Sequence, residues 1–313
     1  MLRYAGIGGR STRRTILLSA SLLCASVYAA VPANAETPAV FTDTAPDKAN
    51  PAAMQFFQLP SHGVLLNAFV YVATGAGPHP TAILLHGFPG NERNLDLAQS
   101  IRRVGWNVIY FDYRGSWGSP GDFSFTHCIE DTESAIAYFR DPYKAAEFRS
   151  DPKTIVLVGH SMGGFVALQA GSLDLNIKAV VTISATDLGT SKVQAIPADK
   201  HDLAANGLAA GLAAEGMAPL VGTTAEILSN EVLANANRWN LVNLAPKLST
   251  RPLLVITSDD GFAGPIGAFV TAVKKSGNQQ VNAVHIPTDH FYSDHRIALQ
   301  RAVVAGLVHL SQK

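Results

Sequence analysis

The chain has 313 residues, and its 24 basic residues (Lys and Arg) equal its 24 acidic ones (Asp and Glu) in number. No basic stripe interleaved with aromatic residues occurs, so the composition argues against nucleic-acid binding, which depends on clustered positive charge. The length suits one α/β domain with an insertion, and we therefore expect one main domain core.

The first 35 residues have the features of an export signal. Four arginines and no acidic residue precede an apolar stretch from residue 15 to about residue 31. Ala33-Asn34-Ala35 then fits a small-x-small cleavage site, so we predict a signal peptide over 1–35 and a mature N-terminus at Glu36. The alternative is a retained membrane anchor, but the apolar stretch is shorter than the ~20 residues that a helix needs to cross a bilayer.

Arg13 and Arg14, with Thr12 before them and apolar residues after them, resemble a twin-arginine export signal. An ordinary basic segment is the alternative. Both routes predict a periplasmic or secreted protein with no stable membrane insertion after cleavage. Cleavage would leave 20 basic against 24 acidic residues, and Cys128 alone among cysteines, so no intramolecular disulfide is expected.

After a flexible arm predicted over 36–52, strand-like and helix-like segments alternate. Two β-rich runs, 54–59 and 64–72, flank Ser61-His62-Gly63 and predict an antiparallel hairpin. Further strands are expected at 81–85, 107–111, 154–158, 179–183, 253–257 and 283–286, and helices near 93–104, 126–140, 162–172, 266–276 and 294–311. This alternation predicts an α/β fold over 53–313, with a doubly wound and mostly parallel sheet covered by helices on both faces.

One connection is too long for this pattern. About 70 residues separate the strands at 179–183 and 253–257, with Ala- and Leu-rich helical segments around 200–215 and 223–236. A compact domain seldom leaves such a stretch unstructured, so we predict a small helical cap over about 186–248 that lines the substrate pocket. Helices packed on the flank of the domain, away from substrate, are the alternative.

A candidate nucleophile lies in Gly159-His160-Ser161-Met162-Gly163-Gly164, a G-x-S-x-G motif between the strand at 154–158 and the helix at 162–172. A serine on such a turn needs neighbours without bulk, because the strand, the turn and the helix crowd together there. A Gly/Ser-rich loop is the alternative, but the flanking strand and helix favour Ser161 as a nucleophile.

A serine hydroxyl needs a base to take its proton, and the base needs a carboxylate to orient it. Two downstream loops, Ser258-Asp259-Asp260-Gly261 and Pro287-Thr288-Asp289-His290, each follow a predicted strand and supply these groups in the chain order Ser, Asp, His. We favour Asp260 over Asp259 as the acid, because Asp260 directly precedes Gly261 and the permissive loop after it.

We favour His290 over His295 as the base, because His295 already falls in the last predicted helix. The alternative is a metal cluster, which would lack the i, i+4 histidine pair of zinc helices and would consist of Asp289, His290, Asp294 and His295. A second possible ligand cluster is explained equally well as the solvated first turn of a helix, and consists of His127, Glu130 and Asp131.

The turn His86-Gly87-Phe88-Pro89-Gly90 follows the predicted strand at 81–85 and can direct a backbone N–H at the nucleophile. We predict that the N–H groups of Phe88 and Met162 form an oxyanion hole, since Pro89 has no N–H. An ordinary loop whose glycines serve packing is the alternative.

Together with Asp112-Tyr113-Arg114-Gly115 and Ser119-Pro120-Gly121, these segments resemble the α/β-hydrolase superfamily over most of 54–313. The D-Y-R-G and G-H-S-M-G-G stretches are similar to its prolyl-oligopeptidase-like and serine-aminopeptidase-like branches and to bacterial esterases. The resemblance implies an α/β-hydrolase fold and a Ser-His-Asp hydrolase without a metal or organic cofactor. The spacing from Asp260 to Pro265 departs from the Asp-x-x-x-Pro pattern common in the superfamily.

We therefore expect an exported serine hydrolase that cleaves a small-molecule carboxylic ester. One alternative is an aminopeptidase-like or dipeptidyl-peptidase-like enzyme acting on a peptide with the same triad, and another is a non-catalytic binding protein of this fold. An aminopeptidase needs carboxylates that hold a free α-amino group, and the candidates are Glu92, Asp96, Glu215 and Glu226.

Overall fold

The computed structural model describes residues 38–194 and 196–311, so the predicted signal peptide over 1–35 lies outside the described residues. A single eight-stranded sheet has the strand order β1-β2-β4-β3-β5-β6-β7-β8. Its strands are β1 (Ala53–Ser61), β2 (Val64–Val72), β3 (His79–Leu85), β4 (Asn107–Phe111), β5 (Ser150–His160), β6 (Ala179–Ile183), β7 (Leu253–Thr257) and β8 (Val281–His285).

Helices occupy most of the connections between these strands. The α-helices are α1 (Leu95–Arg103), α2 (Phe125–Arg140), α3 (Pro142–Glu147), α4 (Met162–Leu173), α5 (Ser191–Gln194), α6 (His201–Ala214), α7 (Ala225–Trp239), α8 (Leu241–Leu244), α9 (Ala263–Lys275) and α10 (Arg296–Ser311). Three short 3-10 helices accompany them, η1 (Pro38–Val40), η2 (Ala198–Lys200) and η3 (Ala245–Leu248).

The predicted hairpin and mostly parallel sheet are confirmed. β1 and β2 pair antiparallel from Ala53 opposite Val72 to Ser61 opposite Val64, and β2 also pairs antiparallel with β4. All other neighbouring strands are parallel. The loops that follow β3, β5, β7 and β8 therefore converge at one edge of the sheet, which is where ligands bind in open α/β sheets.

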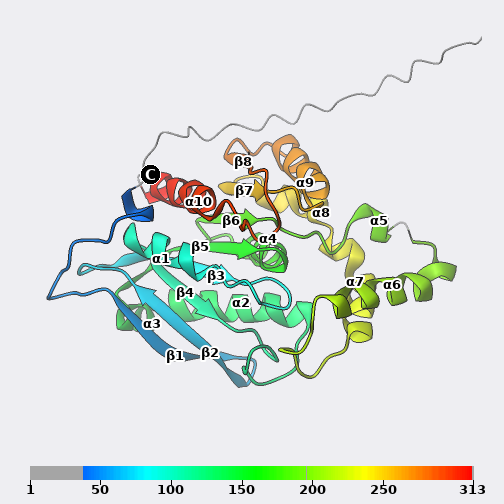
Figure 1. The fold of residues 1–313 in the computed structure, drawn as a ribbon, viewed down its shortest axis with the longest axis horizontal. Coiled ribbons are helices and arrows are strands. Elements are labelled where there is room, and N and C mark those ends of the chain that lie inside the picture. Colours follow the sequence, from blue (N-terminus) through cyan, green and yellow to red (C-terminus); the bar gives the residue numbers. More distant parts are fainter. Residues whose placement is uncertain (1–37, 195, 312–313) are drawn as a thin grey trace, which may run out of the picture.

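Helices cover both faces of the sheet (Figure 1). One core lies between the sheet and α1 and α10, and includes Val108, Val156 and Val303. The other lies under α2, α4 and α9 and includes Leu157 and Phe165. β4, β6 and β7 are buried along their whole length, which explains why they are continuous apolar runs in the sequence.

The long connection between β6 and β7 contains α5, α6, α7 and α8, and the first three of these helices project beyond the sheet (Figure 1). Trp239 at the end of α7 is fully buried and packs edge-to-face on Phe165 of α4, with ring centroids 5.5 Å apart. In α6 only Ala209 is buried. The insertion is therefore anchored through α7, while α6 is largely exposed.

The segment from residue 38 to residue 52 lies against the domain near its start. Val40 is buried, and Arg103 Nε–H in α1 donates a hydrogen bond to the carbonyl oxygen of Ala39 at 2.5 Å. None of the helices in the described part of the chain combines the length and the apolar character that crossing a bilayer requires.

Candidate active site

Ser161 lies on the turn between β5 and α4, at the carboxyl edge of the sheet. Its backbone has φ 55° and ψ −121°, a conformation that strains any residue with a side chain. The neighbouring glycines make this turn possible, because a Cβ on Gly159 would lie 2.0 Å from the carbonyl oxygen of Gly163. A Cβ on Gly163 would lie 2.1 Å from the carbonyl oxygen of Leu85. The turn thus presents Ser161 beyond the end of β5.

The structure brings His290 and Asp260 together from the loops after β8 and β7. His290 Nδ1–H donates a hydrogen bond to Asp260 Oδ2 at 2.8 Å. The Asp260 side chain is 2% exposed, whereas the His290 side chain is 22% exposed. Because the carboxylate can only accept, this bond places the proton on Nδ1 and leaves Nε2 of the neutral ring free to take another.

The neighbouring candidates lie elsewhere. Asp259 is 65% exposed, and its Oδ1 lies 3.0 Å from Nε2 of His285. His295 pairs instead with Asp294, its neighbour in the sequence. The geometry therefore favours Asp260 over Asp259 as the acid and His290 over His295 as the base.

Hydrogen bonds keep Asp260 ionised. Burial alone would raise the pKa of this carboxyl, but hydrogen bonds from His290, the Phe262 amide, Ser184 and Ser258 outweigh burial and hold the pKa well below its ordinary value. The Phe262 N–H donates to Asp260 Oδ1 at 2.9 Å. Asp260 can therefore stabilise a positive charge on His290 across the whole pH range in which a histidine titrates.

The supporting hydroxyls form a small buried cluster. Ser184 Oγ lies 2.8 Å from Ser258 Oγ and 2.9 Å from the hydroxyl oxygen of Tyr292. Burial raises the pKa of Tyr292 to about 12, so its hydroxyl keeps its proton. Sequence reasoning missed this cluster, and the one available signal was that Ser184 and Ser258 each directly follow a predicted strand.

His160, the residue before the nucleophile, connects the turn at Ser161 to the loop of the base. Its Nε2–H donates to the carbonyl oxygen of His290 at 2.9 Å, and the two rings lie 4.8 Å apart. Burial, together with the nearby His290 ring, lowers the pKa of His160 to about 4 and keeps it neutral. No hydrogen bond joins Ser161 Oγ to the His290 ring, and such bonds are often long or misaligned before substrate binds.

The predicted oxyanion donors lie beside the nucleophile. A Cβ on Gly87 would approach Ser161 Cβ to 3.0 Å, so the loop that carries Phe88 passes directly next to Ser161. Met162 is the first residue of α4, and its N–H has no acceptor in the preceding turn of the helix. Among the described residues neither the Phe88 nor the Met162 N–H donates to a backbone carbonyl outside the regular elements. Both donors are therefore available to an anionic oxygen.

The loop that carries Phe88 is braced by two side chains that sequence reasoning missed. Trp117 Nε1–H donates to the carbonyl oxygen of Pro89 at 2.8 Å. The Arg93 guanidinium lies over the Trp117 ring, 4.4 Å from its centroid. The backbone N–H of Trp117 donates to the carbonyl oxygen of Pro219 at 3.0 Å, so the insertion also contacts this brace. No motif marks these residues, because the contacts join three separate loops.

Arg296, at the start of α10, ties the base loop to α1. Its guanidinium donates to the carbonyl oxygen of Phe291, the residue after His290, at 3.0 Å. It also donates to Asn94 at 3.0 Å and, through Nε, to Asp96 at 2.9 Å. Because α1 follows the loop of Phe88, one guanidinium helps to set the distance between the loop of His290 and the loop of Phe88.

The second cluster in the sequence has a structural role. Asp131 is fully buried and accepts hydrogen bonds from Arg114, at 2.7 Å from Nε–H and at 2.8 Å from the backbone N–H. Glu130 accepts from the same guanidinium at 2.5 Å. The explanation of His127, Glu130 and Asp131 as a solvated turn is therefore wrong for Asp131, which holds the loop after β4. Within 38–194 and 196–311 no three His, Cys, Asp or Glu side chains gather as a metal site.

An aromatic contact joins the site to the insertion. The Phe88 ring lies 5.9 Å from that of Phe125, which lies 6.1 Å from the ring of Trp239 in α7. Glu231, about two helical turns before Trp239 in α7, accepts from the backbone N–H groups of Phe125 at 3.0 Å and Thr126 at 2.8 Å. The insertion is thus fixed to the beginning of α2, next to the loop of Phe88.

Comparison with known proteins places this fold among hydrolases. A family model described as "Alpha/beta hydrolase family" matches residues 82–307. Among curated proteins, the uncharacterized protein YfhR of Escherichia coli strain K12 is 34% identical over 102 residues, which are 31% of this chain and 33% of that protein. An uncharacterized protein of Mycobacterium tuberculosis strain H37Rv is 28% identical over 107 residues, 34% of this chain and 36% of that protein. The chain thus spans about a third of these relatives.

Solved structures are similar over more of the chain. Est1E from Butyrivibrio proteoclasticus with bound ferulic acid is 20% identical, with a TM-score of 0.63 over 82% of this chain and 100% of that one. A thermostable carboxyl esterase from Bacillus coagulans in complex with glycerol is 14% identical, with a TM-score of 0.63 over 82% of this chain and 99% of that one. At these identities the similarity shows a shared fold.

Proposed function

The chain belongs to the alpha/beta hydrolase family, and we propose that it is a serine hydrolase that cleaves carboxylic esters through an acyl-enzyme. One observation carries the proposal. His290 is partly exposed and is oriented by the buried Asp260 carboxylate. Its carbonyl oxygen accepts a hydrogen bond from His160, and His160 directly precedes Ser161 on a strained strand-to-helix turn. A serine, a base and an orienting acid in this arrangement are the requirements for nucleophilic acyl transfer.

In the proposed reaction, Ser161 Oγ attacks the ester carbonyl carbon while His290 Nε2 takes the hydroxyl proton. The carbonyl oxygen becomes negative and accepts hydrogen bonds from the N–H groups of Phe88 and Met162. The ester C–O bond then breaks, and His290 gives its proton to the departing alkoxide, which leaves as an alcohol. Water, deprotonated by His290, then attacks the acyl carbon. The bond from that carbon to Ser161 Oγ breaks, Oγ takes the proton back from His290, and the carboxylic acid leaves.

An ester substrate is favoured over a peptide with a free amino end. Asp96 is already paired with Arg296, and Glu92 accepts a hydrogen bond from the Asn94 N–H at 2.5 Å. The other two candidates for holding an amino group, Glu215 and Glu226, lie exposed on the insertion. Structures similar in fold are described as esterases, which supports the same choice.

A fluorophosphonate probe and a small set of substrates test this proposal. We expect the wild-type chain to be labelled by the probe and to hydrolyse p-nitrophenyl acetate and butyrate, whereas Ser161→Ala loses both properties. Labelling that survives in Ser161→Ala would refute the nucleophile. If aminoacyl-anilides gave a far higher kcat/KM than the esters, the peptidase alternative would replace the esterase. Absence of turnover in wild type would favour the non-catalytic binding protein.

We also propose that residues 1–35 export the protein, because a basic segment, an apolar stretch and Ala33-Asn34-Ala35 succeed one another there. The reaction would then take place in the periplasm or outside the cell. None of the proposed chemistry draws on a cofactor.

A further inference from the structure

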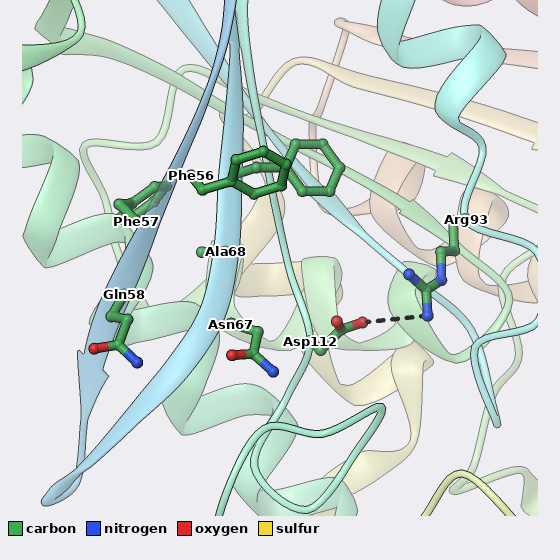
Figure 2. A pocket seen from close by; sticks show the side chains of 8 residues that line it. Phe56, Phe57, Gln58, Asn67, Ala68, Arg93 and Asp112 are labelled. Atoms are coloured by element: carbon green, nitrogen blue, oxygen red, sulfur yellow. Dashed lines mark ion pairs between the residues drawn. The ribbon is translucent and has the colours of Figure 1, made fainter.

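A pocket lies on the hairpin side of the sheet edge that carries Ser161 (Figure 2). It has a volume of about 520 Å³, and its lining includes Phe56, Gln58, Asn67, Phe69, Arg93 and Asp112. Asp112 directly follows β4, and β3 alone separates β4 from β5 and Ser161. Since neighbouring strands lie about 4.8 Å apart, the end of β4 is about 10 Å across the sheet from the nucleophile. One extended ligand could therefore reach both places.

The polar side chains of this pocket combine donors with acceptors. Figure 2 shows Asn67 between Gln58 on one side and Asp112 on the other, with Arg93 beyond Asp112. An amide both donates and accepts, a guanidinium only donates and a carboxylate only accepts. The shortest polar contact of the Arg93 guanidinium within the described chain is the 4.0 Å ion pair with Asp112, so its N–H groups remain available to a ligand.

An aromatic surface borders these polar groups. Phe56 is 78% exposed and contacts Phe69 edge-to-face, with ring centroids 6.2 Å apart. Phe69 in turn stacks on Tyr110, at 5.2 Å. This row of rings continues into the core and holds Phe56 at the rim of the pocket. The exposed ring can pack against the apolar face of a ligand.

The charges of the lining select a neutral ligand. An anion drawn to Arg93 would also meet the Asp112 carboxylate, and a cation drawn to Asp112 would meet the Arg93 guanidinium. Hydroxyl groups donate and accept at once and so satisfy all four planar side chains. A ring that carries several hydroxyls and has an apolar C–H face is a sugar. We propose that this pocket binds a neutral carbohydrate unit of the substrate, which, on the proposed ester function, is a glycan ester.

Binding can be measured without catalysis. In a Ser161→Ala background, xylotriose and cellotriose are titrated against the full chain and followed by NMR chemical shifts or calorimetry. We expect saturable binding of one of them, weakened about tenfold by Phe56→Ala and by Gln58→Ala. Met54→Ala is the matched control, because Met54 lies two residues before Phe56 on the same strand, is also exposed, and does not line the pocket.

Two results would overturn the inference. One is that neither xylotriose nor cellotriose binds, or that a sugar binds equally tightly to the Ser161→Ala parent and to its Phe56→Ala, Gln58→Ala and Met54→Ala variants. The other is that benzoate or inorganic phosphate binds through Arg93 while the sugars do not, which would make this an anion site. In the catalytic background, Phe56→Ala should raise KM for an acetylated xylo-oligosaccharide and leave p-nitrophenyl acetate unchanged.

The inference and the proposed function fail in different ways. If xylotriose or cellotriose binds but no ester is hydrolysed, the proposed function is wrong and carbohydrate binding by the pocket is supported. If p-nitrophenyl acetate is hydrolysed in a Ser161-dependent manner but no sugar binds, the function stands and the pocket does not bind carbohydrate.

Discussion

Asp259 and Asp260 are adjacent carboxylates with opposite surroundings. Asp260 is buried and donates no proton, because its oxygens accept from His290 and from the Phe262 amide. Asp259 points to solvent beside His285. The pair therefore offers a test in which the chemical change is identical and only the environment differs.

We expect Asp260→Asn to lower kcat for p-nitrophenyl acetate about 10³- to 10⁴-fold, because an asparagine there favours the wrong tautomer of His290. Asp259→Asn should stay within about twofold of wild type, as expected for an exposed side chain away from the reacting groups. Steady-state kinetics at pH 7.5 give kcat for both variants. A larger loss of kcat in Asp259→Asn than in Asp260→Asn would make Asp259 the acid that orients His290.

Ser161, the proposed nucleophile, has a strained backbone. With φ at 55° and ψ at −121°, a residue with a Cβ is disfavoured by about 1–2 kcal/mol relative to glycine. Ser161→Gly should therefore unfold at a higher urea concentration than Ser161→Ala, although both lose the hydroxyl. Equal midpoints for the two variants would mean that the turn carries no such strain.

At the scale of elements, α7 holds the insertion on the domain. Glu231 accepts from the first backbone N–H groups of α2, where a negative charge also meets the positive end of the helix. Trp239 fills the contact between α7 and α4. The position of α6 depends on these two anchors, since α6 packs mainly on α7.

Glu231→Ala should lower the free energy of unfolding by about 1–2 kcal/mol, because the N–H groups of α2 lose their acceptor. It should also raise KM for esters, since Phe125 contacts the Phe88 ring of the oxyanion loop. Asn230→Ala, at the exposed neighbour of Glu231 on the same helix, is the control and should neither lower the free energy of unfolding nor raise KM. Thermal or urea unfolding together with KM measures both effects, and identical values for the two variants would contradict the anchor.

Asp187, in the loop after β6, joins the same insertion to the sheet. It accepts from the N–H groups of Gly189 at 3.0 Å and Leu241 at 3.3 Å. Burial raises its pKa from 3.8 to about 6. An acid whose pKa is higher in the folded than in the unfolded state binds its proton more tightly there, so its ionisation costs stability as pH rises from about 4 to about 6.

Asp187→Asn keeps an oxygen that can accept both hydrogen bonds and removes the charge. The variant should therefore gain stability relative to wild type at pH 8, and the gain should shrink at pH 4.5, where the wild-type carboxyl is mostly protonated in the fold. Urea unfolding at the two pH values measures the difference. A gain that does not depend on pH would show that burial of the charge is not its source.

For the whole molecule, the sequence predicted the sheet better than the contacts that complete the site. Strands at 107–111, 179–183 and 253–257 coincide with β4, β6 and β7, because each is an uninterrupted buried run. β5 begins at Ser150 instead of 154, since its first residue pairs with His79 before a shift of register. Periodicity cannot reveal such a pairing, which depends on a strand about 70 residues away.

The same distinction applies to the site. Ser161, Asp260 and His290 were predicted because each lies in the turn or loop after a strand and the parallel sheet brings strand ends together. Trp117, Arg296 and the hydroxyls of Ser184 and Ser258 act through distances between separate loops, which no local pattern encodes. The pairing of His290 with Asp260 rather than Asp259 likewise depends on the direction of two adjacent side chains.

The proposed signal peptide over 1–35 would determine where the whole molecule acts. Expressed with residues 1–35 in a bacterial host, the protein should accumulate in the periplasmic fraction with Glu36 as its first residue. Replacing Arg13 and Arg14 together by lysine should block export only if the twin-arginine route is used. N-terminal sequencing and fractionation test both statements, and an uncleaved, membrane-bound product would favour the anchor.

The glycines of the molecule differ in whether the structure leaves room for a side chain. At Gly159 and Gly163 any side chain would collide with backbone carbonyl oxygens, whereas a Cβ on Gly207 or Gly211 of α6 would meet nothing within 4 Å. In a library of random variants, the turn of the nucleophile should thus tolerate almost no replacement while α6 accepts many. New specificities would accordingly arise in the insertion, with the chemistry inherited unchanged.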